Sequence, residues 1–209
     1  MYMTRVCLKY LPAPNVIHSI LSAAFPGKRS ESANENLWRI DNLGDASFLI
    51  IVSETEPDLH QIVNSIGAQK NNIFVDADDG KPDKTIDYEP FLKRIDIGQI
   101  WNFRLCANPV EHKKQNSSDK RGKVYALRSI PEQVGWLGKQ SAKYGFAVSS
   151  CSIIGDSWIS FNKVRIRSVT FDGILSVTNA DSFRSALTHG IGRGKAYGCG
   201  LITVAKEKV

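Results

Sequence analysis

Apolar residues in the first part of the chain recur with two different periods. Some stretches alternate with a period of two, typical of a half-buried strand, and others with a period near 3.6, typical of an amphipathic helix. In residues 14–25, one apolar stripe is formed by Ile17, Ile20, Leu21 and Ala24. The predicted elements are strand, helix, strand, strand, helix and strand, over residues 1–10, 14–25, 37–40, 47–52, 58–66 and 73–75.

The second part of the chain repeats this plan, with an extra strand and a basic hairpin. It follows a polar, acidic stretch at residues 76–96, which we expect to be a loop and linker. A second polar stretch, residues 111–123, is basic and is expected to form the tip of a hairpin. A bulge or bend is expected at Phe171-Asp172-Gly173. The predicted elements are a strand, a helix, three strands, a helix and a strand, over residues 97–106, 131–144, 148–154, 158–169, 171–177, 180–189 and 200–204.

The repeated order strand-helix-strand-strand-helix-strand is that of the ferredoxin-like unit. We therefore predict an α+β protein of tandem ferredoxin-like (βαββαβ) domains with antiparallel sheets, at residues 1–96 and 97–209. On the helix at 131–144, Val134, Leu137 and Trp136 are expected to face inward. All four tryptophans, Trp38, Trp101, Trp136 and Trp158, are expected in the core rather than as stacking platforms.

Charge is divided unequally between the two predicted domains. Residues 1–96 hold 10 Lys+Arg and 14 Asp+Glu, a net charge of −4, whereas residues 97–209 hold 17 and 7, a net charge of +10. Such a split favours a polyanionic partner for the second half, although scattered cations can also simply solvate a surface. The basic candidates for contact with a nucleic acid in this half are Lys113, Lys114, Lys120, Arg121, Lys123 and Arg128, with Arg165 and Arg167 on one face of a strand.

A glycine-rich segment near the end of the chain carries two cations. It reads Gly-Ile-Gly-Arg-Gly-Lys-Ala-Tyr-Gly-Cys-Gly over residues 190–200. Glycines permit close approach of another backbone, and free N–H groups with cations suit a phosphodiester chain. The segment follows a helix and precedes a strand, the reverse of a dinucleotide or P-loop site, so no nucleotide cofactor is expected. The candidate contacts with a phosphodiester backbone are Gly192, Arg193, Gly194, Lys195 and Gly198, unless the segment is only a tight turn.

Composition excludes several classes of protein. No apolar run reaches about 18 residues, so no membrane span is expected, and no signal peptide opens the chain. Four widely spaced cysteines, Cys7, Cys106, Cys151 and Cys199, form neither zinc-ligand spacing nor a disulfide framework. We therefore expect a cytoplasmic protein with buried thiols, no metal site and no cofactor.

Three motifs together resemble one family. A helix with a histidine follows the first strand (Asn-Val-Ile-His-Ser, residues 15–19), Phe-Arg-Leu-x-Ala-Asn-Pro stands at 103–109, and the glycine segment closes the chain. This combination is similar to the CasE family, the CRISPR precursor-RNA endoribonucleases of the type I-E Cascade complex, within the repeat-associated RNA-binding superfamily. The terminal glycine motif is shared by that superfamily, and the Phe-Arg-Leu-x-Ala-Asn-Pro segment distinguishes the family.

The resemblance, which covers essentially the whole chain, implies a metal-independent endoribonuclease. Such an enzyme binds the hairpin of the CRISPR repeat RNA, cuts 3′ of the stem base by attack of a ribose 2′-OH, and works with other Cascade subunits. The general acid/base histidine of the family matches His18. The family often has a tyrosine one turn earlier, where this chain has Asn15, so the role of that tyrosine stays unassigned.

The chemistry is consistent with these residues. An imidazole can transfer protons near neutral pH, and cations such as Lys28 and Arg29, just beyond the helix of His18, can stabilise a phosphorane in place of a metal. The other histidines, His60, His112 and His189, fit this role less well. Two alternatives stay open: a non-catalytic RNA-binding subunit of the same architecture, and a regulator of another nucleic acid.

Overall fold

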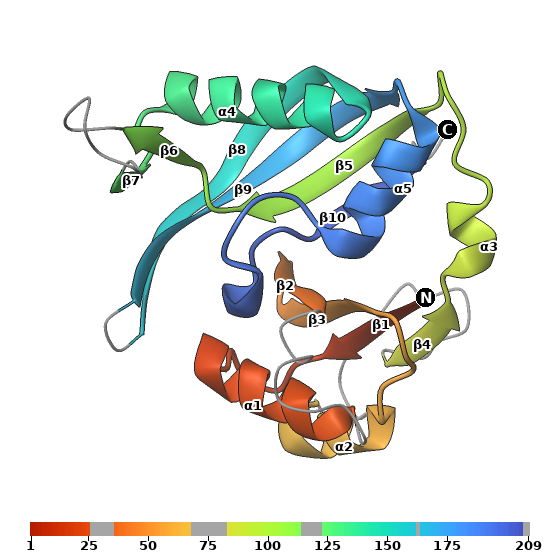
Figure 1. Ribbon diagram of the computed structural model, residues 1–209. Coiled ribbons are helices and arrows are strands. Elements are labelled where there is room, and N and C mark those ends of the chain that lie inside the picture. The colour runs from red at the N-terminus through yellow and green to blue at the C-terminus, as the bar shows by residue number, and fades with distance from the viewer. Residues whose placement is uncertain (26–35, 68–82, 114–122, 162–163, 207–209) are drawn as a thin grey trace.

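The computed structural model describes residues 1–25, 36–67, 83–113, 123–161 and 164–206. It contains two four-stranded antiparallel sheets, which we call the N-terminal sheet and the C-terminal sheet (Figure 1). The N-terminal sheet has the order β2-β3-β1-β4, from Leu37–Leu43, Ala46–Ser53, Tyr2–Cys7 and Lys84–Asp87. The C-terminal sheet has the order β10-β5-β9-β8, from Ile202–Ala205, Ile100–Ala107, Val164–Val177 and Phe146–Phe161.

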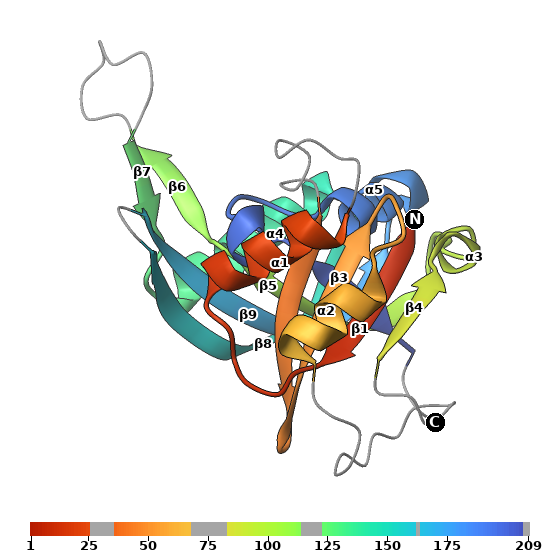
Figure 2. The same cartoon turned by 90° about the horizontal axis from the view of Figure 1, so that it is seen from below.

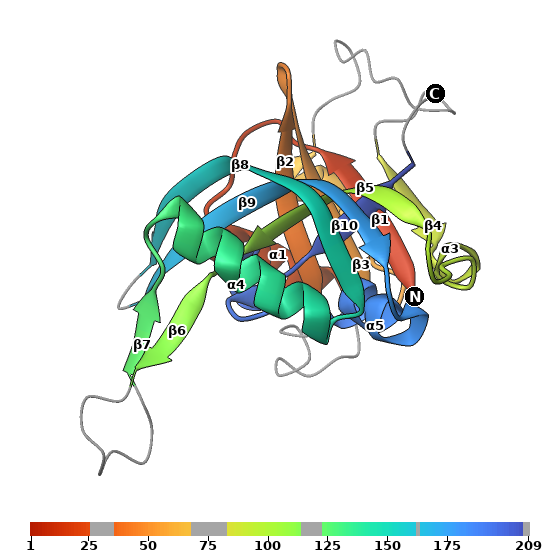
Figure 3. The ribbon, with the colours of Figure 1, turned by 90° about the horizontal axis from the view of Figure 1, so that it is seen from above.

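Each sheet carries its helices on one side. Helices α1 (Pro14–Ala24) and α2 (Leu59–Ile66) cover the N-terminal sheet (Figure 2), and α4 (Ile130–Lys143) and α5 (Ala180–His189) accompany the C-terminal sheet (Figure 3). The fourth strand of each unit lies beside its first strand, and the second lies at the opposite edge. The predicted tandem ferredoxin-like fold is therefore confirmed, whereas the boundary after residue 96 stays a prediction.

The prediction of a loop over residues 76–96 is wrong for the part that the structure describes, residues 83–96. It contains β4 and a short helix, α3 (Glu89–Leu92). Strand β4 pairs with β1 along the edge of the N-terminal sheet, from Tyr2 opposite Asp87 to Arg5 opposite Lys84. Its sequence, Lys-Thr-Ile-Asp, has a single aliphatic residue, so it lacks the apolar alternation that identified the other strands. The strand expected at 73–75 lies outside the described residues.

The three strands expected between 148 and 177 are in fact two long ones, β8 and β9. Phe161 pairs with Val164, so the reversal falls inside the segment expected as the strand 158–169. The bulge or bend expected at Phe171-Asp172-Gly173 is also wrong, because β9 runs through these residues and the register shifts lie in β8, between Val148 and Ser150 and between Ile153 and Gly155. Gly173 instead allows close approach, since a side chain there would collide with the carbonyl of Ser150.

The inner face of α4 is only partly as expected. Trp136 and Leu137 are buried as predicted, whereas Val134 is 40% exposed and Gln133 takes an inward position. The Gln133 amide donates to the carbonyl of Leu127 and to Asp156, which satisfies its nitrogen inside the protein. A capping box between Ser129 and Glu132 begins the helix.

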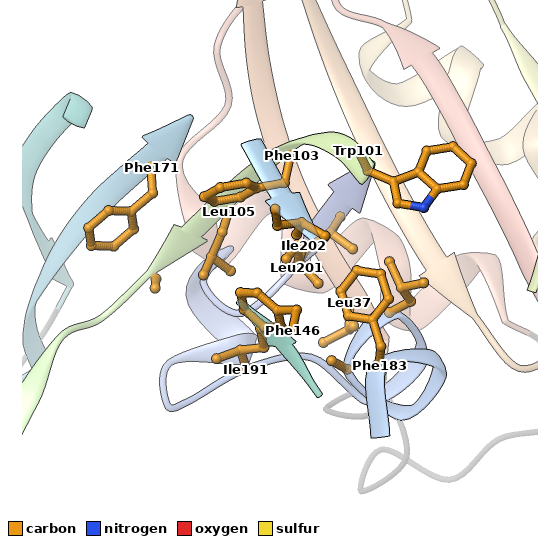
Figure 4. Close-up of a cluster of buried hydrophobic side chains, with 14 of the residues drawn as sticks. Leu37, Trp101, Phe103, Leu105, Phe146, Phe171, Phe183, Ile191, Leu201 and Ile202 are labelled. Carbon is orange, nitrogen blue, oxygen red and sulfur yellow. The ribbon is translucent and has the colours of Figure 1, made fainter. Parts of the chain in front are cut away.

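One hydrophobic core joins the two sheets. Leu37 and Val52 of the N-terminal sheet belong to the same buried cluster as Phe103, Phe146 and Phe183 of the C-terminal unit (Figure 4). A separate cluster lies between the N-terminal sheet and α1 and α2, and contains Val6, Ile17, Leu21, Leu49, Ile51 and Ile62. The shared cluster holds the two sheets in one arrangement, because separating them would expose its apolar surface to water.

None of the helices in the described part of the chain has both the length and the apolar character needed to cross a membrane.

Candidate nucleic-acid interface

The glycine-rich segment forms a loop around a short 3-10 helix, η2 (Lys195–Tyr197), between α5 and β10. Gly194 and Gly198 flank η2 in the left-handed conformation, with φ of 85° and 82°. Gly190, Gly192 and Gly200 also have positive φ. Only glycine adopts these angles without strain, so the spacing of the glycines determines the path of the loop.

The loop contacts the connection that leads into the basic hairpin. Its residue Arg193 forms an isolated backbone bridge with Asn108, the asparagine of the Phe-Arg-Leu-x-Ala-Asn-Pro segment. The exposed Arg193 guanidinium has its Nη1 3.4 Å from Nε2 of His112, on strand β6 (Val110–Lys113). Lys195 is half-buried in η2. Arg193 therefore lies at the junction between β6 and the C-terminal sheet, whereas Lys195 belongs to η2, which contacts α1 and β2.

Helix α1, which carries His18, lies beside η2. In Figure 1, η2 is the dark-blue turn between β2 and α1. His18 is half-buried, its carbonyl accepts a hydrogen bond from the Ser22 hydroxyl, and Asn15 is exposed in the first turn. The fold thus brings the helix of His18 and the cationic loop together although about 175 residues separate them in sequence. The expected cations Lys28 and Arg29 lie outside the described residues.

The basic hairpin consists of β6 and β7 (Lys123–Ala126) and projects away from both sheets (Figures 2 and 3). Lys113 and Lys123 form the last described backbone pair before the tip, and Lys123 and Arg128 are exposed. The expected tip cations Lys114, Lys120 and Arg121 lie outside the described residues. Exposed cations attract polyanions, so the described part of the hairpin stays a candidate for contact with nucleic acid.

Arg165 and Arg167 share one face of β9, as their spacing predicted. Their guanidinium carbons lie 4.4 and 5.4 Å from the ring centroid of Trp158, on β8. Trp158 is 36% exposed, so the expectation that it belongs to the core is wrong, whereas Trp38, Trp101 and Trp136 are buried. The ring is covered by two cations instead of by apolar side chains, which is a cation–π arrangement.

The two arginines differ in their partners. Arg167 forms a bidentate ion pair with Asp156, with N–O distances of 2.7 and 2.6 Å. Hydrogen bonding from Arg167 holds the pKa of the Asp156 carboxyl below its ordinary value. Arg165 is exposed over the tryptophan ring. The charge of Arg167 is therefore already neutralised by a neighbour, and Arg165 is the stronger candidate for contact with a phosphate.

Arg39, on β2, is a buried charged residue that was not among the predicted site residues. It is 3% exposed, and its guanidinium bonds Asp41 as well as the carbonyls of Arg104 and Leu201. The sequence did contain a signal for this residue, since Arg39 is a charged residue inside the apolar run Leu-Trp-Arg-Ile of a predicted strand. A charged side chain that is buried in such a strand requires hydrogen-bonding partners.

Two buried thiols lie under the loop. The thiol of Cys106 on β5 lies 3.1 Å from the Ser168 hydroxyl, and its interaction with Cys199 of the loop lowers the pKa of Cys106 and raises that of Cys199. All four cysteines are free, as predicted, although Cys151 is only half-buried. Within the described ranges, no three His, Cys, Asp or Glu side chains come together as a metal-ligand set.

Comparison with known proteins places this arrangement in a family. A family model described as CRISPR associated protein matches residues 1–206. The CRISPR-associated endoribonuclease Cse3 of Thermus thermophilus is 26% identical, over 97% of this chain and 94% of its own length. The CRISPR system Cascade subunit CasE of Escherichia coli is 30% identical, over 54% of this chain and 61% of its own length.

Solved structures show the same fold. Thermus thermophilus Cse3 bound to an RNA representing a pre-cleavage complex has a TM-score of 0.77 at 25% identity, with 98% of both chains covered. Cas6e from Escherichia coli has a TM-score of 0.63 at 21% identity, with 98% of this chain and 99% of that chain covered. The predicted resemblance to CasE is confirmed, and the chain belongs to the CRISPR associated protein family.

Proposed function

We propose that this protein is an endoribonuclease that binds the hairpin of CRISPR repeat RNA and cuts precursor RNA on the 3′ side of the stem base. The observation that carries the proposal is the placement of α1, with His18, beside η2, with Lys195. A general acid/base candidate and a cationic loop with left-handed glycines thus come together from opposite ends of the chain. The Cse3 structures with RNA share this fold over nearly the whole chain.

Cleavage by a ribose 2′-OH needs three things from the protein. A base removes the proton of the attacking 2′-OH, an acid protonates the leaving 5′ oxygen, and positive charge stabilises the phosphorane between them. His18 fills one of the two proton-transfer roles, either of which an imidazole can take, and Arg193 and Lys195 supply charge from the loop. The products are a 2′,3′-cyclic phosphate or 3′-phosphate and a 5′-OH.

RNA is gripped mainly by the C-terminal half. The grip is formed by the basic hairpin, Arg165 over Trp158, and the glycine loop, and it acts on the backbone and shape of A-form RNA, whose deep major groove hides its bases. The domain of residues 1–96 supplies His18 and that of 97–209 the grip, in line with their net charges of −4 and +10. The setting is the cytoplasm, with other Cascade subunits as partners.

Cleavage is expected to proceed fully in excess chelator. Protein cations take the charge-stabilising role, so removal of divalent metal leaves the rate of the wild-type protein unchanged. The test is single-turnover cleavage of the repeat hairpin from the source genome in EDTA, with both product ends identified. A requirement for Mg²⁺ and products with 5′-phosphate ends would contradict the mechanism, and a bound but uncut RNA would identify a non-catalytic subunit.

Replacing Lys123 and Arg128 by alanine is expected to weaken hairpin binding and to flatten its dependence on salt. Each phosphate contact contributes about 0.7–0.9 to the slope of log affinity against log salt, so losing two contacts lowers the slope by roughly 1.4–1.8. The measurement is a titration of labelled hairpin at several salt concentrations.

The matched control for this pair is Lys93→Ala with Arg94→Ala. These cations are also exposed, but they follow α3, on the side of the molecule away from the basic hairpin (Figure 1). Equal effects of the two pairs would show that affinity follows net charge alone, and that β6–β7 makes no particular contact with RNA.

A further inference from the structure

Strand β2 lies at the edge of the N-terminal sheet, and three of its consecutive residues contact the end of the chain. Leu37 packs so closely against Gly190 that a Cβ on the glycine would lie 2.7 Å from Leu37 Cδ2. The ring of Trp38 lies under Gly198, where a Cβ would be 2.7 Å from Cζ3. Arg39 reaches the carbonyl of Leu201, directly after the glycine loop. One edge strand therefore contacts the loop at its beginning and at its end.

Arg39 makes five hydrogen bonds, and three of them cross between the sheets. Its Nη1 donates to the carbonyls of Arg104 (2.8 Å) and Leu201 (3.0 Å), and its Nη2 donates to the hydroxyl of Thr203 (2.7 Å). Its Nε and Nη2 also donate to the two oxygens of Asp41, on its own strand, at 2.6 and 2.7 Å. Asp41 thus compensates the buried charge and orients the plane of the guanidinium toward the C-terminal sheet.

The same strand is also connected to α1. Trp38 belongs to the buried cluster that contains Ile17 and Leu21 of α1, the helix of His18. Its ring therefore touches the glycine loop at Gly198 and packs in the core on which α1 rests. Any shift of β2 relative to the C-terminal sheet would change the position of the loop relative to α1.

We propose that Arg39 is a positioning residue for RNA cleavage, which through β2 and Trp38 holds the glycine loop in register with the helix of His18. The inference rests on the proposed endoribonuclease function and adds to it a residue that touches neither RNA nor the reacting atoms. Its effect is geometric, because displacing a catalytic group by about 1 Å can cost about 10²-fold in rate.

Lysine cannot replace arginine in this role. The guanidinium presents five N–H donors in a rigid plane, so it bonds Asp41 on one side and two carbonyls and a hydroxyl on the other. An ammonium has three donors on one nitrogen and cannot reach these separated acceptors together. Arg39→Lys therefore keeps the charge that compensates Asp41 and loses most of the connection between the sheets.

The test measures binding and cleavage separately for Arg39→Lys. We expect the single-turnover rate at saturating protein to fall about 10–100-fold. Affinity for the RNA hairpin is expected to stay within about threefold of wild type, because β6–β7 and Arg165 also hold the RNA and a small shift leaves the loop cations in place. Amide hydrogen exchange is expected to speed up at Gly200, whose N–H donates to the Cys106 carbonyl at 2.6 Å. Thr203→Val, which removes one crossing hydrogen bond, is expected to give a smaller change in the same direction.

Arg184→Lys is the matched control. Arg184 also bonds two carbonyls, those of Leu92 and Ile95, and an aspartate, Asp181, but it does not contact the glycine loop. Replacing Arg184 by lysine is therefore not expected to lower the cleavage rate selectively relative to the affinity for the RNA hairpin. An Arg39→Lys protein that cuts normally, or whose rate and affinity fall together, would overturn the proposal. If Arg39→Lys did not fold, the same criteria applied to Thr203→Val would decide.

Hydrogen exchange separates the two proposals. If wild-type protein does not cut the hairpin, the endoribonuclease function fails, but exchange at Gly200 still reports whether Arg39 holds the loop. Unchanged exchange in Arg39→Lys, together with an active wild type, would reject the positioning role and leave the function intact.

Discussion

Replacing His18 by alanine is expected to slow cleavage of the repeat hairpin by about 10²–10⁴-fold and to leave its affinity near that of wild type. The imidazole carries protons in the transition state and makes little contact in the ground state, so its loss appears in the rate alone. His18 is half-buried on α1, whose core positions are Ile17, Leu21 and Ala24, so alanine leaves the packing of the helix intact. Single-turnover kinetics and equilibrium binding with the same RNA measure the two effects.

The control for this substitution is His60→Ala. His60 is an exposed histidine on α2, the helix that packs beside α1 on the same sheet. Its replacement is expected to change neither rate nor affinity. A His18→Ala protein that cuts at the wild-type rate would remove His18 from the mechanism, and parallel loss of rate and affinity would make it a binding residue.

Replacing Gly198 by alanine is expected to destabilise the protein and to weaken RNA binding at the same time. A left-handed backbone costs an L-residue about 1–2 kcal/mol, and forcing a methyl group against Trp38 adds about 1–3 kcal/mol, a total of about 2–5 kcal/mol. For a chain of this size, that corresponds to a fall in melting temperature of about 4–20 °C. Thermal melts and hairpin titrations measure the two losses.

Gly98→Ala separates the two causes. Gly98 has the same φ of 82° as Gly198, but a Cβ there meets no atom within 4 Å. It should therefore show only the backbone cost, and the difference between the two variants gives the contribution of Trp38. Equal losses of stability in the two variants would mean that the loop moves away from Trp38 at no cost. In that case the ring does not hold the loop in place.

Most elements could be predicted because their signal is local. The helix expected at 180–189 is α5 (Ala180–His189), and helix α1 differs from its expected range by one residue. Strand β4 was missed because an edge strand exposed to water needs no apolar alternation. The reversal between β8 and β9 was missed because the strand pattern continues through both partners of a ribbon that extends beyond the core.

Some features of the candidate site could likewise be predicted from the sequence, and others could not. The residue types that make chemistry possible, a histidine on an amphipathic helix and cations between glycines, are visible in sequence because their roles depend on their own side chains and backbone. Trp158 was misassigned because burial is a property of the neighbours, and its neighbours are Arg165 and Arg167 across a hairpin. The pairing of Arg167 with Asp156 was likewise invisible in the spacing of the charges.

The sequence by itself therefore determined the ferredoxin-like repeat, the basic character of the second half, the left-handed loop and the family. Only the tertiary structure decided that α1 lies beside η2 and that Arg39 connects the two sheets. The physical reason is the separation along the sequence over which each signal acts. Periodicity and glycine spacing report on residues a few positions apart, whereas Arg39 and Leu201 are 162 positions apart and meet only because a shared core packs the two sheets together.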